Sequence, residues 1–164
     1  MAYILSRDGR DNDVVAAFAR YKGFLQSQET VFPPRAYELA TAEWFYDPRD
    51  HRCPHDAWLE SCQIVKSRDE RRRAGPCSIS IRLLGAYHDG HIRITYPNVF
   101  SYSLMSLSSA AKSHGDWRYD EFRLSESNHL IHEIEWSGAP GPLQRSFSWT
   151  IEADDIEFEW ELVK

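Results

Sequence analysis

A histidine and a carboxylate stand two residues apart in the segment 114–117, directly after a stretch rich in serine. Histidine beside a carboxylate is the minimum for general base catalysis, and serine hydroxyls are potential nucleophiles. No Gly-x-Ser-x-Gly motif is present, so the spacing identifies no partner serine. We therefore expect the loop 106–117 to bind a ligand rather than to catalyse, with His114, Asp116 and Trp117 as contact residues. The alternative is a loop whose polar groups satisfy its own backbone.

A further histidine, His132, lies in an alternating segment on the same side as Leu130 and Trp136. That side is expected to face the core, where a histidine is more often a hydrogen-bonded core residue than a ligand. If the sheet encloses a cavity, His132 becomes a polar group inside that cavity. His132 is therefore the fourth candidate ligand-binding residue, and no catalytic residue is assigned.

Two other clusters contain potential metal ligands. His51, Cys53 and His55 alternate in a segment that a proline keeps out of helix, so their side chains can point the same way. Structural zinc sites space their ligands differently, so a polar linker that holds these residues without a metal is the preferred interpretation. His88 and His91 flank an Asp-Gly pair that a tight hairpin turn itself requires. We predict no metal site and no cofactor.

Charge is distributed unevenly along the chain, whose net charge is -6. Residues 118–164 contain eleven acidic and four basic side chains. If the last strands are neighbours, the outer face of the sheet collects Glu133, Glu135, Glu157, Glu159 and Glu161. This face is either solvated, which discourages edge pairing, or an acidic patch that attracts a basic protein. The arginine run within 68–73 contains two acids and no aromatic residue, so we expect no nucleic acid partner.

The first third of the chain has helical periodicity. Residues 11–13 offer an N-cap, and apolar side chains follow at helical spacing from Val14 to Leu25. Pro34 can open a second helix, which we expect to run to about Phe45.

From Trp58 onward the apolar period changes from 3.6 to 2, most clearly in residues 156–162, where four apolar residues alternate with three glutamates. Strict alternation is typical of antiparallel sheets with one buried face. Strands are expected near 58–66, 77–87, 91–96, 99–105, 118–124, 129–136, 145–152 and 156–163. The residues expected to be buried in the last two strands are Phe147, Trp149, Ile151, Phe158, Trp160 and Leu162.

The predicted fold class is α+β, with two N-terminal helices packed on a curved, mostly meandering antiparallel sheet of about eight strands. Because short links favour pairing between consecutive strands, we expect one sheet, either open or curled toward a barrel.

Composition limits the remaining possibilities. A chain of 164 residues makes one domain, here with a helical part over 1–50 and a β part over 57–164. No apolar run approaches the roughly 20 residues of a membrane span or resembles a signal peptide, so no membrane partner is expected. Three cysteines, an odd number, favour free thiols and a cytoplasmic location.

These observations favour a non-enzymatic binding domain whose curved sheet presents a pocket or a surface to a small molecule or to a protein. One alternative is an acidic interaction module, including an inhibitor of a basic protein. Another is a small hydrolase or isomerase with a site made of histidine and carboxylates. The sequence alone predicts no ligand identity and no oligomeric state.

Overall fold

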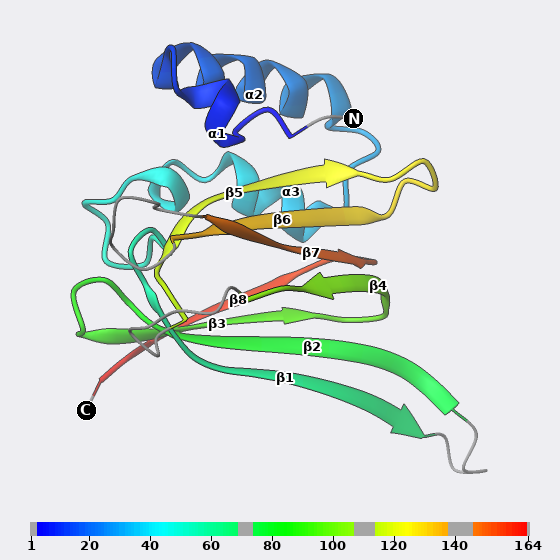
Figure 1. The fold of residues 1–164 in the computed structure, drawn as a ribbon. Coiled ribbons are helices and arrows are strands. Elements are labelled where there is room, and N and C mark those ends of the chain that lie inside the picture. The colour runs from blue at the N-terminus through cyan, green and yellow to red at the C-terminus, as the bar shows by residue number, and fades with distance from the viewer. Residues whose placement is uncertain (1–2, 69–73, 107–113, 138–145, 164) are drawn as a thin grey trace.

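The computed structural model describes residues 3–68, 74–106, 114–137 and 146–163, and it is an α+β fold in which every strand pairing is antiparallel (Figure 1). The eight strands form two four-stranded sheets rather than the single sheet expected from the sequence. The first sheet has the order β1-β2-β3-β8, and the second has the order β4-β7-β6-β5. Neither sheet closes on itself, so a barrel is not confirmed.

Three α-helices and a 3-10 helix form the N-terminal part: α1 (Arg7–Arg10), α2 (Val14–Gln28), α3 (Pro34–Thr41) and η1 (Glu43–Tyr46). The Asp13 side chain caps α2 by accepting a hydrogen bond from the backbone N–H of Ala16, at 2.9 Å. The second predicted helix is interrupted, because the backbone at Ala42 is extended and η1 follows as a separate element. The short helix α1 was not expected. No helix within the described residues is long and apolar enough to span a membrane.

The strand bounds follow the predicted ranges closely. They are β1 (Trp58–Arg68), β2 (Ala74–Leu84), β3 (Gly90–Tyr96), β4 (Val99–Leu104), β5 (Trp117–Leu124), β6 (Leu130–Trp136), β7 (Phe147–Ala153) and β8 (Glu157–Leu162). Consecutive strands pair in β1-β2-β3 and in β5-β6-β7, which is the expected meander.

Two tight connections, β3–β4 and β7–β8, carry the chain from one sheet to the other and break the meander. β3 leads through Pro97 and Asn98 into β4, yet β3 pairs with β8, and β4 pairs with β7. Asn98 has a φ of 49° and its side-chain amide donates to Asp154 at 2.6 Å, which ties this connection to the one between β7 and β8. A short link brings strands close but does not decide whether they pair. The single-sheet expectation was wrong for this reason.

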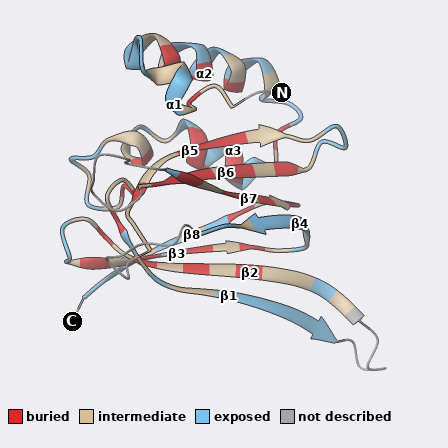
Figure 2. Ribbon diagram, in the orientation of Figure 1, coloured by how far each residue is buried: buried red, intermediate tan, exposed pale blue. Residues whose placement is uncertain are grey.

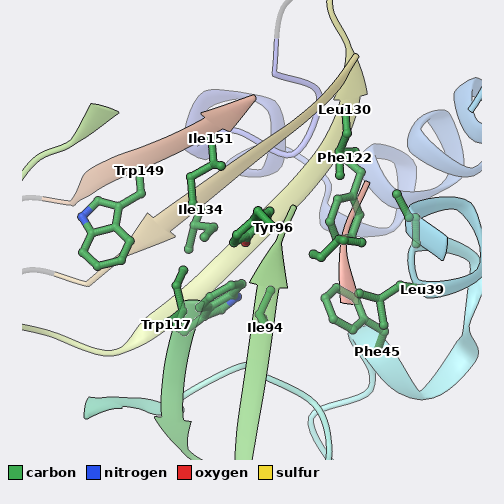
Figure 3. Close-up of a cluster of buried hydrophobic side chains, with 14 of the residues drawn as sticks. Leu39, Phe45, Ile94, Tyr96, Trp117, Phe122, Leu130, Ile134, Trp149 and Ile151 are labelled. Atoms are coloured by element: carbon green, nitrogen blue, oxygen red, sulfur yellow. The ribbon is translucent and has the colours of Figure 1, made fainter. Parts of the chain in front are cut away.

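The core lies between the two sheets and is rich in aromatic rings. Tyr96 lies in the middle of this cluster, with Trp117 and Ile134 close by (Figure 3). On the helical side, the Phe45 ring lies 5.7 Å from Phe122 of β5 and 6.3 Å from Phe158 of β8. The η1 segment therefore fills the gap between the two sheets.

The expected burial in the last two strands is met in β7 only. Phe147, Trp149 and Ile151 are buried. In β8 the three glutamates are exposed as predicted, but Phe158 and Trp160 are half-buried and Leu162 is 67% exposed. β8 is the last strand of its sheet, so its side chains have neighbours on one side only.

Candidate functional site

Two of the predicted site residues belong to a chain of hydrogen bonds inside the core. The indole N–H of Trp117 donates to Asp120 at 3.0 Å, and the other carboxylate oxygen of Asp120 lies 2.9 Å from Nε2 of His132. Nδ1 of His132 lies 2.6 Å from the hydroxyl of Tyr96. All four residues are buried. We call this set the buried polar chain.

A neutral histidine satisfies every group in the buried polar chain. If Nε2 of His132 carries the proton and donates to Asp120, Nδ1 is free to accept from the Tyr96 hydroxyl. Burial raises the pKa of Tyr96, which keeps that hydroxyl protonated as a donor. Both ring nitrogens of His132 are then occupied by the protein itself, so neither is left for a substrate.

The space beside the buried polar chain is small. A cavity of about 20 Å³ lies next to Asp120 and is also lined by Cys53 and His55. This volume holds about one water molecule, far less than the several hundred Å³ of a typical ligand pocket. The arrangement therefore stabilises the contact between the sheets and is not an accessible reaction site.

Asp120 was not anticipated from the sequence. Alternation from Trp117 places Asp120 on the outer side of β5, but the register against β6 shifts between Trp117 and Tyr119. This bulge turns Asp120 inward toward His132. The segment 117–120 contains no glycine or proline, and no local pattern predicts the bulge.

The other two predicted site residues lie elsewhere. The His114 ring packs edge-on against Trp136 and Trp149, with centroids 4.4 and 4.9 Å apart, and burial lowers its pKa. Asp116 is only partly buried, and burial raises the pKa of its carboxyl. The structure therefore joins Trp117 and His132 through Asp120 and places His114 and Asp116 outside the buried polar chain. Residues 107–113 of the predicted loop lie outside the described residues.

The histidine and cysteine side chains that were considered as metal ligands do not lie together either. His51 pairs with Asp89, with Nδ1 and Oδ2 2.5 Å apart, whereas the Cys53 thiol points inward and donates to the carbonyl of Phe45. Burial raises the pKa of Cys53 to about 12. His91 pairs with Glu60 at 3.1 Å. No three histidine, cysteine or acidic residues in the described part of the chain are placed to hold a metal ion.

The expected acidic face is divided between the two sheets. Glu133 and Glu135 lie on β6, in the second sheet, whereas the three glutamates of β8 lie in the first. Each of the five has an arginine partner: Glu133 pairs with Arg123, Glu135 with Arg10, Glu157 with Arg35, Glu159 with Arg93, and Glu161 with Arg82. The prediction that they share one face was wrong, because it assumed a single sheet.

A groove of about 490 Å³ runs between α3 and β8, and we call it the α3–β8 groove. Its apolar lining comes from Leu39, Ala42, Trp44, Ile156 and Phe158. Its charged lining comes from Arg35, Glu38, Glu157 and Glu159. The Trp44 and Phe158 rings are 5.0 Å apart, so the aromatic part of the lining is continuous from η1 to β8.

Asp155 fixes one end of the α3–β8 groove. Its carboxylate accepts hydrogen bonds from the backbone N–H groups of Ala36 and Ile156, both at 2.9 Å. The first bond caps α3 and the second holds the start of β8, so one side chain sets the distance between the two walls.

The chain was compared with protein-family models, with curated proteins and with solved structures, and none of the three comparisons found a match.

Proposed function

We propose that the protein is a non-enzymatic binding domain that holds an apolar, basic segment of a partner protein in the α3–β8 groove. The observation that carries the proposal is the composition of the groove, an apolar lining beside a predominantly acidic rim. Ligand sites in proteins have this character, with a mainly apolar surface and a few charged groups that set orientation.

The charges on the rim favour a basic ligand. Arg35 is already paired with Glu157, which leaves Glu38 and Glu159 as the other carboxylates of the groove. Among the described residues, the ion pair of Glu159 is a long contact with Arg93, at 3.9 Å, and both side chains are well exposed. Lysine or arginine side chains that flank an apolar residue would therefore meet two weakly neutralised carboxylates.

Binding is favoured over catalysis because the histidine-carboxylate pair of the core is enclosed. His132 and Asp120 are buried and have only a water-sized cavity beside them. The α3–β8 groove contains no histidine, cysteine or serine in its lining. The groove lining therefore lacks the side chains that most often act as nucleophiles or proton carriers, and in this proposal its glutamates bind a basic ligand.

The proposal is tested with a synthetic heptapeptide that alternates lysine with leucine, and with its counterpart in which glutamate replaces lysine. Calorimetry should detect binding of the lysine peptide only, and the indole signal of Trp44 should shift in nuclear magnetic resonance spectra. The variant Glu38→Lys should weaken binding about threefold to fivefold, because an exposed ion pair contributes up to ~1 kcal/mol. Ala42→Trp should weaken binding more than tenfold, because the larger side chain occupies the groove.

Glu126→Lys is the matched control. Glu126 is an exposed glutamate in the turn between β5 and β6, outside the groove, so its reversal changes the net charge equally. Affinity should be unchanged in this variant. Equal losses in Glu38→Lys and Glu126→Lys, equal binding of both peptides, or no binding of the lysine peptide would each contradict the proposal.

A further inference from the structure

The four strands at the ends of the two sheets differ in how their free edges are protected. An unpaired edge exposes backbone N–H and C=O groups that can pair with another strand, and proteins normally block it. The end strands are β1 and β8 in the first sheet, and β4 and β5 in the second.

The edge of β5 is capped by α2. The Tyr21 hydroxyl accepts a hydrogen bond from the backbone N–H of Phe122, at 2.8 Å, and donates to the carbonyl of the same residue, at 3.1 Å. Tyr21 is itself buried. One side chain thus satisfies both backbone groups that an added strand would use at this position.

The edges of β8 and β1 are protected in other ways. β8 borders α3 and η1, and the Trp44 ring contacts Phe158. β1 carries Glu60, Lys66 and Arg68, and its register against β2 shifts twice. Charged side chains and bulges are both known to discourage pairing between sheet edges.

β4 carries no charged side chain, although its register against β7 shifts once, between Val99 and Ser101. Its residues from Phe100 to Ser103 are all exposed, and the strand is pale along most of its length in Figure 2. Phe100 is 52% exposed, Tyr102 48% and Met105 57%. No charged residue occurs between positions 98 and 106. Exposed aromatic and serine side chains on an uncharged edge are the features of a strand that accepts another strand.

We infer that β4 is a self-association edge, at which two copies of this chain pair antiparallel and join their second sheets into one. A two-fold axis through this edge places each residue opposite a residue of the same short segment, so an edge without charges opposes no like charges. The same pairing of β8 would set glutamates against glutamates. Because each chain carries a net charge of -6, the copies repel over much of their surface, and an uncharged edge is where they can meet.

Charge placed at the centre of β4 tests this assignment. Sedimentation velocity should show a concentration-dependent dimer of the natural chain in the micromolar range. Tyr102→Lys and Tyr102→Glu should each weaken the dimer more than tenfold, because like charges then lie at the centre of the shared edge. An equimolar mixture of the two variants should restore a dimer, since lysine then faces glutamate.

Val65→Lys is the matched control, because Val65 is an exposed apolar residue on another end strand, β1. This variant should dimerise like the natural chain. Hydrogen exchange on the unmodified protein provides a second measurement, in which amides of 99–104 become more protected as the concentration rises and amides of 58–68 do not. The inference would be overturned if the natural chain stayed monomeric at all concentrations. It would also be overturned if each Tyr102 variant dimerised alone, or if their mixture formed no dimer. None of these outcomes involves the α3–β8 groove, which lies beside the other sheet.

Discussion

The outer faces of the two sheets carry the same pairs of residue types in different surroundings. On the first sheet, Arg93 and Glu159 stand across β3 and β8 with side chains 50% and 70% exposed. On the second sheet, Arg10 meets Glu135 at 2.8 Å with side chains 9% and 10% exposed. Because the residue types are the same, the surroundings of each pair decide how much it contributes to the free energy of unfolding.

The N-terminal segment makes the difference. The helices α1 and α2 lie beside β5, at the end of the molecule away from β1 (Figure 1). Arg10 lies 3.6 Å from the centre of the Tyr119 ring, and the backbone N–H of Leu5 donates to Glu121 at 2.7 Å. Glu121 is fully buried as a result. A pattern of alternating glutamates therefore indicates a strand, but not whether its polar side stays in water.

Removing Arg10 should have the largest effect on stability. Arg10→Ala leaves Glu135 almost buried without its cation, and breaking such a pair costs about 3 kcal/mol or more. Urea denaturation at pH 7 measures the loss. Arg7→Ala is the control, because the ion pair of Arg7 with the described residues is an exposed contact with Asp11 at 3.9 Å. The free energy of unfolding should change by less than about 0.5 kcal/mol in this variant. Similar losses of stability in Arg10→Ala and Arg7→Ala would mean that the buried ion pair contributes no more than the exposed one.

Glu121 should make the second sheet sensitive to pH. Burial raises its pKa to about 7, although hydrogen bonds from the backbone at Leu5 and Ile4 act in the opposite direction. Because the folded protein then binds the proton more tightly than the unfolded chain, stability contributed by this group is present at low pH and falls as the pH rises through 7. The loss between pH 5 and pH 8 should be on the order of 2–3 kcal/mol.

Glu121→Gln removes this dependence while keeping an oxygen that can accept from Leu5. Unfolding should therefore be measured at pH 5 and pH 8. The free energy of unfolding of the variant should rise relative to that of the natural protein as the pH rises. Glu126→Gln, an exposed glutamate, corrects for the general effect of one lost charge. Parallel pH profiles for the natural chain and Glu121→Gln would show that Glu121 is not responsible.

Much of this fold follows from local patterns, and the missed parts are long-range. The apolar periods predicted α2 and all eight strands, because side-chain direction depends on the backbone within a few residues. The pairing of β3 with β8 was missed, because it joins residues that are distant in the chain. The cover over Glu121 depends in the same way on Leu5, far from it in sequence.

The candidate site shows the same limit. His132 lies on the core side of β6, as the alternation predicted, and it meets Trp117 through Asp120. Asp120 itself was missed, because a bulge reverses its side of the strand. The α3–β8 groove was missed as well, since it needs the position of α3 against the last strand of a sheet that the sequence did not predict.

The smallest effect is expected on the exposed face. Glu159→Gln removes a carboxylate whose contact with Arg93 is 3.9 Å long and open to solvent, so the free energy of unfolding should change by less than about 0.5 kcal/mol. Raising the salt concentration should erase even this difference, because ions screen exposed pairs. Glu135→Gln makes the same chemical change on the second sheet, where Arg10 would be left nearly buried without a counter-charge, and it should cost well over 1 kcal/mol at any salt concentration. If Glu159→Gln lowered the free energy of unfolding as much as Glu135→Gln, the outer face of the first sheet would also have to be covered in solution. The contrast between the two faces would then be wrong.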